Sequence, residues 1–211
     1  MSSEVAEALI AIGGVGFRPS DPITFKSGIK SPVYCDNRRF PFWPEQWEKV
    51  IRGFAALIAE RTVPCDVVGG IEAAGIPHSA ALGFASMTPS IFIRKEAKSH
   101  GAKKRIEGGD VTDKHVVLVE DLVTTGSSSL SAVEALRDEG AIVEDCLCII
   151  SYGFAEAVTN FTNAGVKLHA LTTFPEVLKV AVAQGVLDES GAAVVQDWLN
   201  DPHGWAAKHG F

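Results

Sequence analysis

Residues 116–129 read VVLVEDLVTTGSSS. A mostly aliphatic run leads directly into two adjacent acids, Glu120 and Asp121, and a short segment of Thr, Gly and Ser follows. The aliphatic run predicts a buried strand that ends at the two acids, and the small polar residues predict a turn into a helix that begins near Ser127 or Ser128. In open parallel sheets, ligands bind outside the carboxyl ends of the strands. We therefore expect a ligand site at this turn.

The residue types at the turn indicate which chemical groups it binds. Backbone N–H groups at a helix N-terminus bind phosphate, and Gly126 allows a phosphate to approach closely. Carboxylates repel phosphate but accept hydrogen bonds from sugar hydroxyls, so Glu120 and Asp121 suit a diol or a metal ion that the substrate carries. The pattern favours a phosphorylated sugar, although a strand followed by a capped helix with solvated acids stays open as the alternative. The turn matches neither GxxxxGK[ST] nor GxGxxG.

Strands and helices alternate on both sides of this turn, with short links between them. Helices are expected at 3–12 and 44–61, and an extended hairpin or bent ribbon is expected around Ser27-Gly28. Further expected strands are 65–70, 90–95, 115–121, 142–152 and 166–173, and further expected helices are 76–86, 128–140, 154–165 and 175–185. A helix and then a loop around Pro202 are expected in residues 190–211. This alternation predicts an α/β fold with a mostly parallel, twisted sheet flanked by helices.

Composition narrows the class of protein further. The 211 residues carry 19 Lys and Arg against 26 Asp and Glu, a net charge of −7, which disfavours a broad nucleic-acid surface. No apolar run approaches the ~20 residues of a membrane span. Four cysteines show no CxxC spacing, and the first residues are acidic and amphipathic, unlike a signal peptide. The expected setting is a reducing cytoplasm.

One polar segment, residues 96–114, interrupts the alternation. Five basic residues follow Arg94 by position 105, namely Lys95, Lys98, Lys103, Lys104 and Arg105. The segment is too long for an ordinary connection and too polar to pack. It is either a solvated loop or a mobile lid that closes over an anion.

Four stretches together resemble one known family. VVLVEDLVTTGSSS is similar to the phosphoribosyl-pyrophosphate (PRPP) motif of type I phosphoribosyltransferases. Residues 92–109 (FIRKEAKSHGAKKRIEGG) resemble the mobile catalytic loop of orotate phosphoribosyltransferases. Residues 25–38 (FKSGIKSPVYCDNR) resemble the orotate-side segment of that family, and residues 66–83 (DVVGGIEAAGIPHSAALG) its pyrophosphate-side loop and helix. The resemblance covers about residues 3–187.

The resemblance implies both a fold and a reaction. The fold is that of a type I phosphoribosyltransferase in one domain, residues 1–211, with an N-terminal helix and small hood over about 1–40, a core over about 41–187, a tail over about 188–211 and a flexible catalytic loop. The reaction transfers the 5-phosphoribosyl group from PRPP to orotate and yields orotidine 5′-monophosphate and pyrophosphate in pyrimidine synthesis. The family implies Mg²⁺ carried by PRPP, and a homodimer in which the loop reaches the neighbouring subunit's site.

The same resemblance assigns roles to individual residues. Lys98 and His100 match catalytic residues on the loop, and with Arg94 and Lys95 they match its pyrophosphate contacts. Glu120 and Asp121 match the residues that hold the ribose hydroxyls, directly or through metal-bound water. The remaining PRPP-binding positions are Leu122, Val123, Thr124, Thr125, Gly126, Ser127 and Ser128. Thr124 also lies near orotate in the family, while Lys26 and Lys30 are candidates for the orotate end or the pyrophosphate.

The sequence departs from the family pattern in two places. Some members carry an orotate-contacting Arg where this chain has Ser151, Tyr152 and Phe154, and some carry a Tyr-Lys pair where this chain has Ala73-Ala74. Which groups hold the orotate carboxylate is therefore left open. A phosphoribosyltransferase for a purine or uracil, and a non-catalytic PRPP-sensing regulator, are the alternatives.

Overall fold

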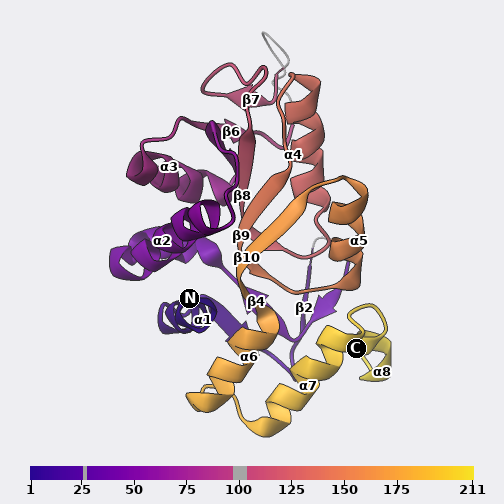
Figure 1. Cartoon of the computed structure of the whole chain (residues 1–211). Coiled ribbons are helices and arrows are strands. Elements are labelled where there is room, and N and C mark those ends of the chain that lie inside the picture. Colours follow the sequence, from indigo (N-terminus) through magenta and orange to yellow (C-terminus); the bar gives the residue numbers. More distant parts are fainter. Residues whose placement is uncertain (26–27, 97–103) are drawn as a thin grey trace.

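The computed structural model describes residues 1–25, 28–96 and 104–211 (Figure 1). Within these residues a six-stranded sheet has the order β10-β9-β8-β5-β6-β7. Its strands are β5 Val67–Ile71, β6 Ser90–Ile93, β7 Ile106–Glu107, β8 Val116–Val123, β9 Asp145–Ser151 and β10 Lys167–Thr173. All neighbouring strands are parallel except β6 and β7. The sheet confirms the α/β, mostly parallel fold expected from the sequence.

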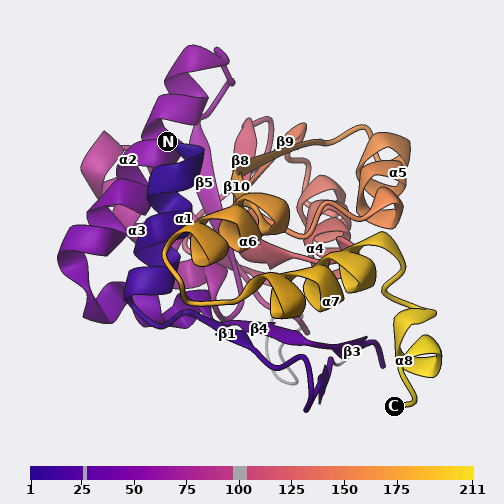
Figure 2. The same cartoon turned by 90° about the horizontal axis from the view of Figure 1, so that it is seen from below.

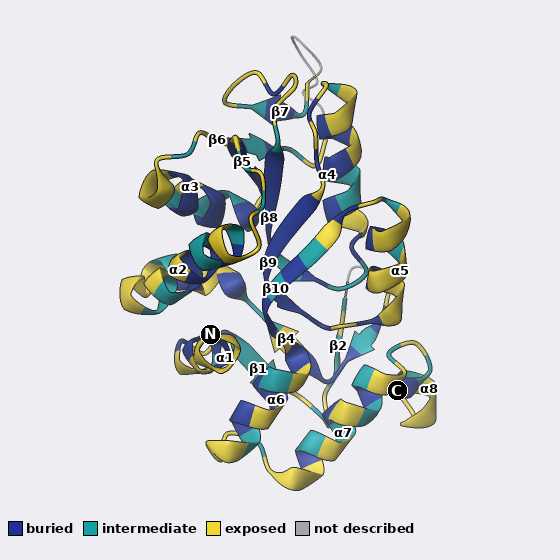
Figure 3. Ribbon diagram, viewed as in Figure 1, coloured by how far each residue is buried: buried dark blue, intermediate teal, exposed yellow. Residues whose placement is uncertain are grey.

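Helices cover both faces of the sheet, which explains why its central strands are apolar along their length. On one face lie α1 Ser2–Ala11, α2 Pro44–Glu60, α3 Gly75–Ser86 and α6 Phe174–Ala183, and on the other lie α4 Ser127–Asp138 and α5 Ala155–Asn163 (Figure 1). Each face has its own apolar cluster. Figure 3 shows the resulting gradient, with buried central strands and exposed outer helix faces.

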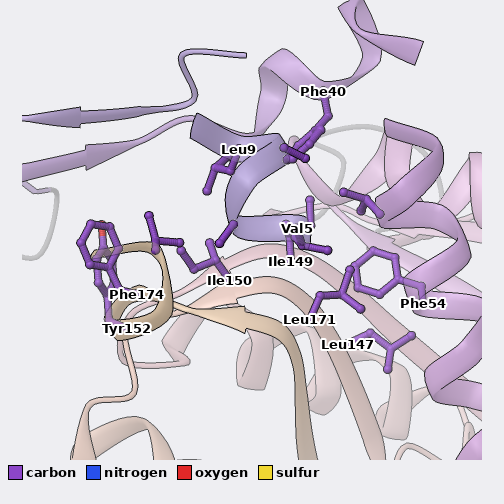
Figure 4. Close-up of a cluster of buried hydrophobic side chains, with 14 of the residues drawn as sticks. Val5, Leu9, Phe40, Phe54, Leu147, Ile149, Ile150, Tyr152, Leu171 and Phe174 are labelled. Carbon is purple, nitrogen blue, oxygen red and sulfur yellow. The ribbon is translucent and has the colours of Figure 1, made fainter. Parts of the chain in front are cut away.

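Helix α2 illustrates how periodicity produces this packing. Its first residue is Pro44, whose fixed φ suits the first helical turn. Val50, Phe54 and Leu57 recur at helical spacing and are buried against the sheet. Figure 4 shows Phe54 beside Leu147 and Leu171 of neighbouring strands, with Val5 of α1 close by.

The amino-terminal segment forms two small antiparallel pairs below the main sheet. β1 Val15–Phe17 pairs with β4 Val33–Cys35, and β2 Ile23–Thr24 pairs with β3 Lys30–Ser31, which confirms the expected hairpin. A 3-10 helix, η1 Asn37–Phe42, follows. The tail helices α7 Glu189–Asn200 and α8 Trp205–Lys208 lie beside this segment (Figure 2). The indole N–H of Trp198 donates to the backbone oxygen of Lys30 at 2.9 Å and ties the tail to β3.

Several element boundaries differ from the sequence-based expectation. The strand expected to end at the two acids continues to Val123, because Leu122 and Val123 pair with Ile150 and Ser151 of β9. β9 itself begins at Asp145 rather than 142, since Ile142 forms only an isolated bridge with His115. The edge strand β7 and the short helix α8 were not expected, because elements of two and four residues are too short to show a periodic pattern. In the described part of the chain, no helix combines the length and apolarity needed to cross a bilayer.

Candidate active site

A cavity of about 530 Å³ opens at the carboxyl end of β8. Three groups of residues line it. The motif side, defined as residues 120–128, contributes Glu120, Asp121, Leu122, Thr124, Thr125 and Ser128. The amino-terminal wall, defined as residues 23–38, contributes Ile23, Thr24, Phe25, Tyr34, Cys35, Asp36 and Arg38. The remaining lining residues are Glu72, Ala73, Ala74, Lys95 and Tyr152.

The two acids of the motif side differ in their surroundings. The Glu120 side chain is buried and accepts a hydrogen bond from the backbone N–H of Asp121 at 3.0 Å. Burial, followed by the neighbouring Asp121 charge, raises the pKa of Glu120 well above its usual range. Asp121 is only half-buried, and its backbone oxygen accepts from Asn37 Nδ2 at 3.0 Å. Asp121 is therefore the acid that can present an accessible carboxylate to hydroxyl groups in the cavity.

The turn after β8 is shaped by Gly126. Its φ is +86°, and a Cβ at this position would lie 2.6 Å from a ring carbon of Phe161. Only glycine can adopt this positive φ without strain and leave room for the Phe161 ring without a shift of α5. Asn160 Nδ2 donates to the backbone oxygen of Thr125 at 3.0 Å, and the hydroxyls of Thr125 and Ser127 lie 3.0 Å apart. The turn thus holds hydroxyl groups and the first N–H groups of α4 where an anion can bind.

The third side of the cavity carries the residues expected near pyrophosphate. Lys95 lines the cavity, and its backbone N–H donates to Glu72 Oε2 at 2.9 Å. The Glu72–Ala73 peptide bond is cis. Arg94 is not among the lining residues, and its guanidinium lies 4.0 Å from Glu107 instead. Arg105 braces this strand end through a 2.8 Å bond from its Nε to the backbone oxygen of Arg94.

The structure brings seven of the expected site residues to the cavity. These are Lys95, Glu120, Asp121, Leu122, Thr124, Thr125 and Ser128. Val123 is buried in the core, and Gly126 and Ser127 shape the turn without lining the cavity. Lys30 does not line it either. Lys26, Lys98 and His100 lie outside the described residues, as do all of residues 97–103 of the expected lid.

Several lining residues were not singled out from the sequence. Asp36 and Arg38 belong to the stretch that resembles the orotate-side segment, and this resemblance is the sequence feature that could have identified them as lining residues. Tyr152, by contrast, was noted in the sequence where some family members carry an Arg, and its hydroxyl is buried without a hydrogen-bond partner among the described residues. Removal from water, and then the charges of Asp121 and Asp36, raise the pKa of the Cys35 thiol, so it is not a thiolate nucleophile.

His78 lies outside the cavity and has a packing environment. Its Nδ1 accepts the indole N–H of Trp47 at 2.9 Å, and burial lowers the pKa of His78 to about 4. A neutral, fully buried imidazole supports the α2–α3 contact. Across the described residues, no cluster of three or more His, Cys, Asp or Glu could hold a metal ion. The acids at the cavity instead suit a metal that keeps substrate and water ligands, as Mg²⁺ does.

The chain is similar to curated proteins along nearly its whole length. No protein-family model matches the chain. Orotate phosphoribosyltransferase of Coxiella burnetii is 38% identical over 204 residues, which cover 97% of this chain and 98% of that protein.

Solved structures of the same class have similar folds. UMP synthase of Leishmania donovani has a TM-score of 0.81 and 27% identity over 94% of this chain, which spans only 42% of that longer chain. Orotate phosphoribosyltransferase of Mycobacterium tuberculosis, in complex with PRPP, has a TM-score of 0.66 and 25% identity over 83% of this chain and 97% of that one.

Proposed function

The chain belongs to the orotate phosphoribosyltransferase family, and from that premise we propose that it transfers the 5-phosphoribosyl group of PRPP to orotate. The products are orotidine 5′-monophosphate and pyrophosphate, in a step of UMP biosynthesis. The observation that carries the proposal is one cavity that combines the acid pair Glu120–Asp121, the turn at Gly126 and an aromatic wall. The acids suit the ribose diol, the turn suits the phosphate, and the aromatic side chains suit the base.

We infer the following placement of the substrate. The 5′-phosphate binds at Thr124–Ser128, where N–H and hydroxyl groups converge and the start of α4 favours negative charge. The ribose hydroxyls donate to Asp121 and Glu120. The base lies against the amino-terminal wall, next to Phe25 and Tyr34. This order along the cavity directs the anomeric carbon toward the side where Lys95 lies.

The transfer breaks the bond between the anomeric carbon and a pyrophosphate oxygen, and forms the bond from that carbon to the base nitrogen. Negative charge grows on the departing pyrophosphate, so cations that face it stabilise the transition state. Lys95 supplies one from the cavity edge. Lys98 and His100 are proposed to supply others from the loop, which would also exclude water. Arg94 is proposed to reach the pyrophosphate after leaving its position beside Glu107.

Mg²⁺ is proposed to arrive bound to PRPP, where it would offset the charge of the pyrophosphate. Asp121 would face it as a carboxylate, directly or through water, and the buried Glu120 lies beside this position, because Mg²⁺ commonly binds one or two carboxylates together with substrate phosphates. Both acids lie at the cavity.

A homodimer with the loop acting in trans is also proposed. Phe84 and Met87 at the end of α3 are 84% and 87% exposed, and Phe42 before α2 is 80% exposed. Apolar side chains that cluster at the surface mark protein interaction sites, and Phe84 and Met87 lie about one helical turn apart. Mixing Lys98→Ala with Asp121→Asn protein would test the arrangement, since hybrid dimers regain activity only if a loop serves the partner's site.

We further propose that the chain is one domain, with an amino-terminal part over about 1–40, a core over 41–187 and a tail over 188–211. A cytoplasmic location is proposed as well. The four cysteines are free thiols, as a reducing compartment would keep them.

The direct test is turnover of orotate with PRPP and Mg²⁺, followed by release of pyrophosphate. Orotidine 5′-monophosphate formation is the expected result. Turnover of hypoxanthine, adenine or uracil in place of orotate would instead support a phosphoribosyltransferase for another base. PRPP binding without turnover of any base would support a regulator.

A further inference from the structure

Arg38 introduces a positive charge into the amino-terminal wall. The described residues that line the cavity include two cations, Arg38 and Lys95, and these come from different sides. Lys95 follows β6, whereas Arg38 lies in η1, next to Tyr34 and Asp36. A guanidinium on the base side therefore calls for a ligand group other than the leaving pyrophosphate.

Two neighbours hold the Arg38 guanidinium in a fixed orientation. Its Nε donates to Asp36 Oδ1 at 2.6 Å, and its Nη2 donates to the Tyr34 hydroxyl at 2.9 Å. A guanidinium has more N–H groups than these two bonds use, so donors remain for a ligand. The side chain is 63% exposed, which leaves it accessible from the cavity.

The surroundings of Arg38 indicate the kind of ligand group. Phe25 and Tyr34 give this part of the cavity aromatic surfaces, which suit a planar heterocycle. Asp36 and Asp121 also lie at the cavity, and both would repel an anionic edge of that heterocycle. An anionic base therefore needs a directed cation at this wall. Because Asp36 offsets part of the charge of Arg38, selectivity rests on oriented charge-assisted hydrogen bonds rather than on net charge.

We propose that Arg38 donates hydrogen bonds to the carboxylate of the base, and that it thereby selects a carboxylated pyrimidine over an uncharged one. The inference deepens the proposed function and rests on it. Arg38 acts in binding the base, not in PRPP binding, so its loss affects one substrate only.

The test compares two arginine variants of the full-length protein. Arg38→Gln removes the proposed contact. Arg18→Gln is the matched control, because Arg18 is similarly exposed, pairs with Asp21 at 3.1 Å and does not line the cavity. Both variants lose an ion pair made by an exposed arginine, and such a pair contributes little to stability. The KM for orotate, the KM for PRPP and the melting temperature are measured for each.

Arg38→Gln is expected to raise the KM for orotate by roughly tenfold to a hundredfold, the range for hydrogen bonds between charged groups. Its KM for PRPP and its melting temperature stay at the wild-type values, and Arg18→Gln matches the wild type throughout. An unchanged KM for orotate in Arg38→Gln, or an equal rise in both KM values, overturns the assignment of Arg38. A wild-type protein that fails to turn over orotate overturns the proposed function itself, which separates the two failures.

Discussion

The two sides of the cavity are built in different ways. The motif side continues directly from β8, a strand buried from Val116 to Glu120 and paired on both sides by β5 and β9. The amino-terminal wall consists of strands of two or three residues and the start of η1, with an exposed Tyr34 and an exposed Arg38. Sheet geometry therefore fixes the groups that are proposed to hold phosphate and diol. The groups proposed to hold the base depend on local side-chain contacts and on the tail helix α7.

This difference suggests that the rigid motif side positions the sugar and that the amino-terminal wall selects the base. A precise position for the sugar is needed for any phosphoribosyl transfer, because misplacement of the reacting carbon is costly. The choice of base can be altered by residues on a surface wall without disturbing the core. Substitutions on the motif side should accordingly change stability or PRPP binding, and substitutions on the wall should change the KM for orotate.

The largest effect is expected from Gly126→Ala. The new Cβ would meet Phe161 and adopt a left-handed backbone, and together these cost about 3 kcal/mol of unfolding free energy. PRPP affinity should fall as well. Gly185→Ala is the control, because its φ is +69° but no heavy atom lies within 4 Å of the added Cβ. Chemical denaturation and PRPP calorimetry measure both, and equal losses in the two variants would show that the Phe161 contact is unimportant.

Asp121→Asn should weaken PRPP binding by about tenfold, the effect of losing one charge-assisted hydrogen bond. Asp121 lines the cavity and is half-buried, so its carboxylate can accept from a sugar hydroxyl. Asp138→Asn, an exposed substitution on α4, serves as the control. Unchanged PRPP affinity by calorimetry would contradict the diol role.

Glu120→Gln should change how stability depends on pH. The folded protein raises the pKa of Glu120, so this residue contributes stability below its unfolded pKa of about 4.3 that is lost as pH rises through the folded pKa. Gln does not titrate, and its amide oxygen can still accept the N–H of Asp121. The melting temperature of the variant relative to wild type should therefore be higher at pH 8 than at pH 5. The same difference at both pH values would mean that burial does not hold a proton on Glu120.

The smallest effect is expected from Tyr34→Phe on the wall. The variant loses the hydroxyl that accepts from Arg38, so the guanidinium is less well oriented. The KM for orotate should rise only about threefold, at the low end of what a hydrogen bond contributes, because the loss acts on orotate only through Arg38, and stability should be unchanged. A larger rise in the KM for PRPP than for orotate would contradict the assignment of the amino-terminal wall to base binding.

The motif side was predictable from the sequence because each residue type there follows from strand and turn geometry. The aliphatic residues before Glu120 predicted a buried strand, and the Thr, Gly and Ser residues after Asp121 predicted a turn into a helix. The helix–strand alternation likewise predicted the mostly parallel sheet. The continuation of β8 to Val123 depends on pairing with β9, which no local pattern reveals.

The amino-terminal wall was less predictable, for a physical reason. Arg38 reaches the cavity because Asp36 and Tyr34 orient it, and Trp198 ties β3 to a helix that is distant in sequence. Such contacts depend on tertiary structure rather than on periodicity. The role of Arg94 at the pyrophosphate stays a prediction, and its guanidinium lies 4.0 Å from Glu107.

The most direct test of the division between the two sides is a crystal structure with bound orotidine 5′-monophosphate. We expect its phosphate at the N–H groups of Thr124–Ser128, its ribose hydroxyls at Asp121 and Glu120, and its carboxylate at Arg38. A nucleotide bound with its phosphate at the amino-terminal wall, or with its hydroxyls away from both acids, would contradict it.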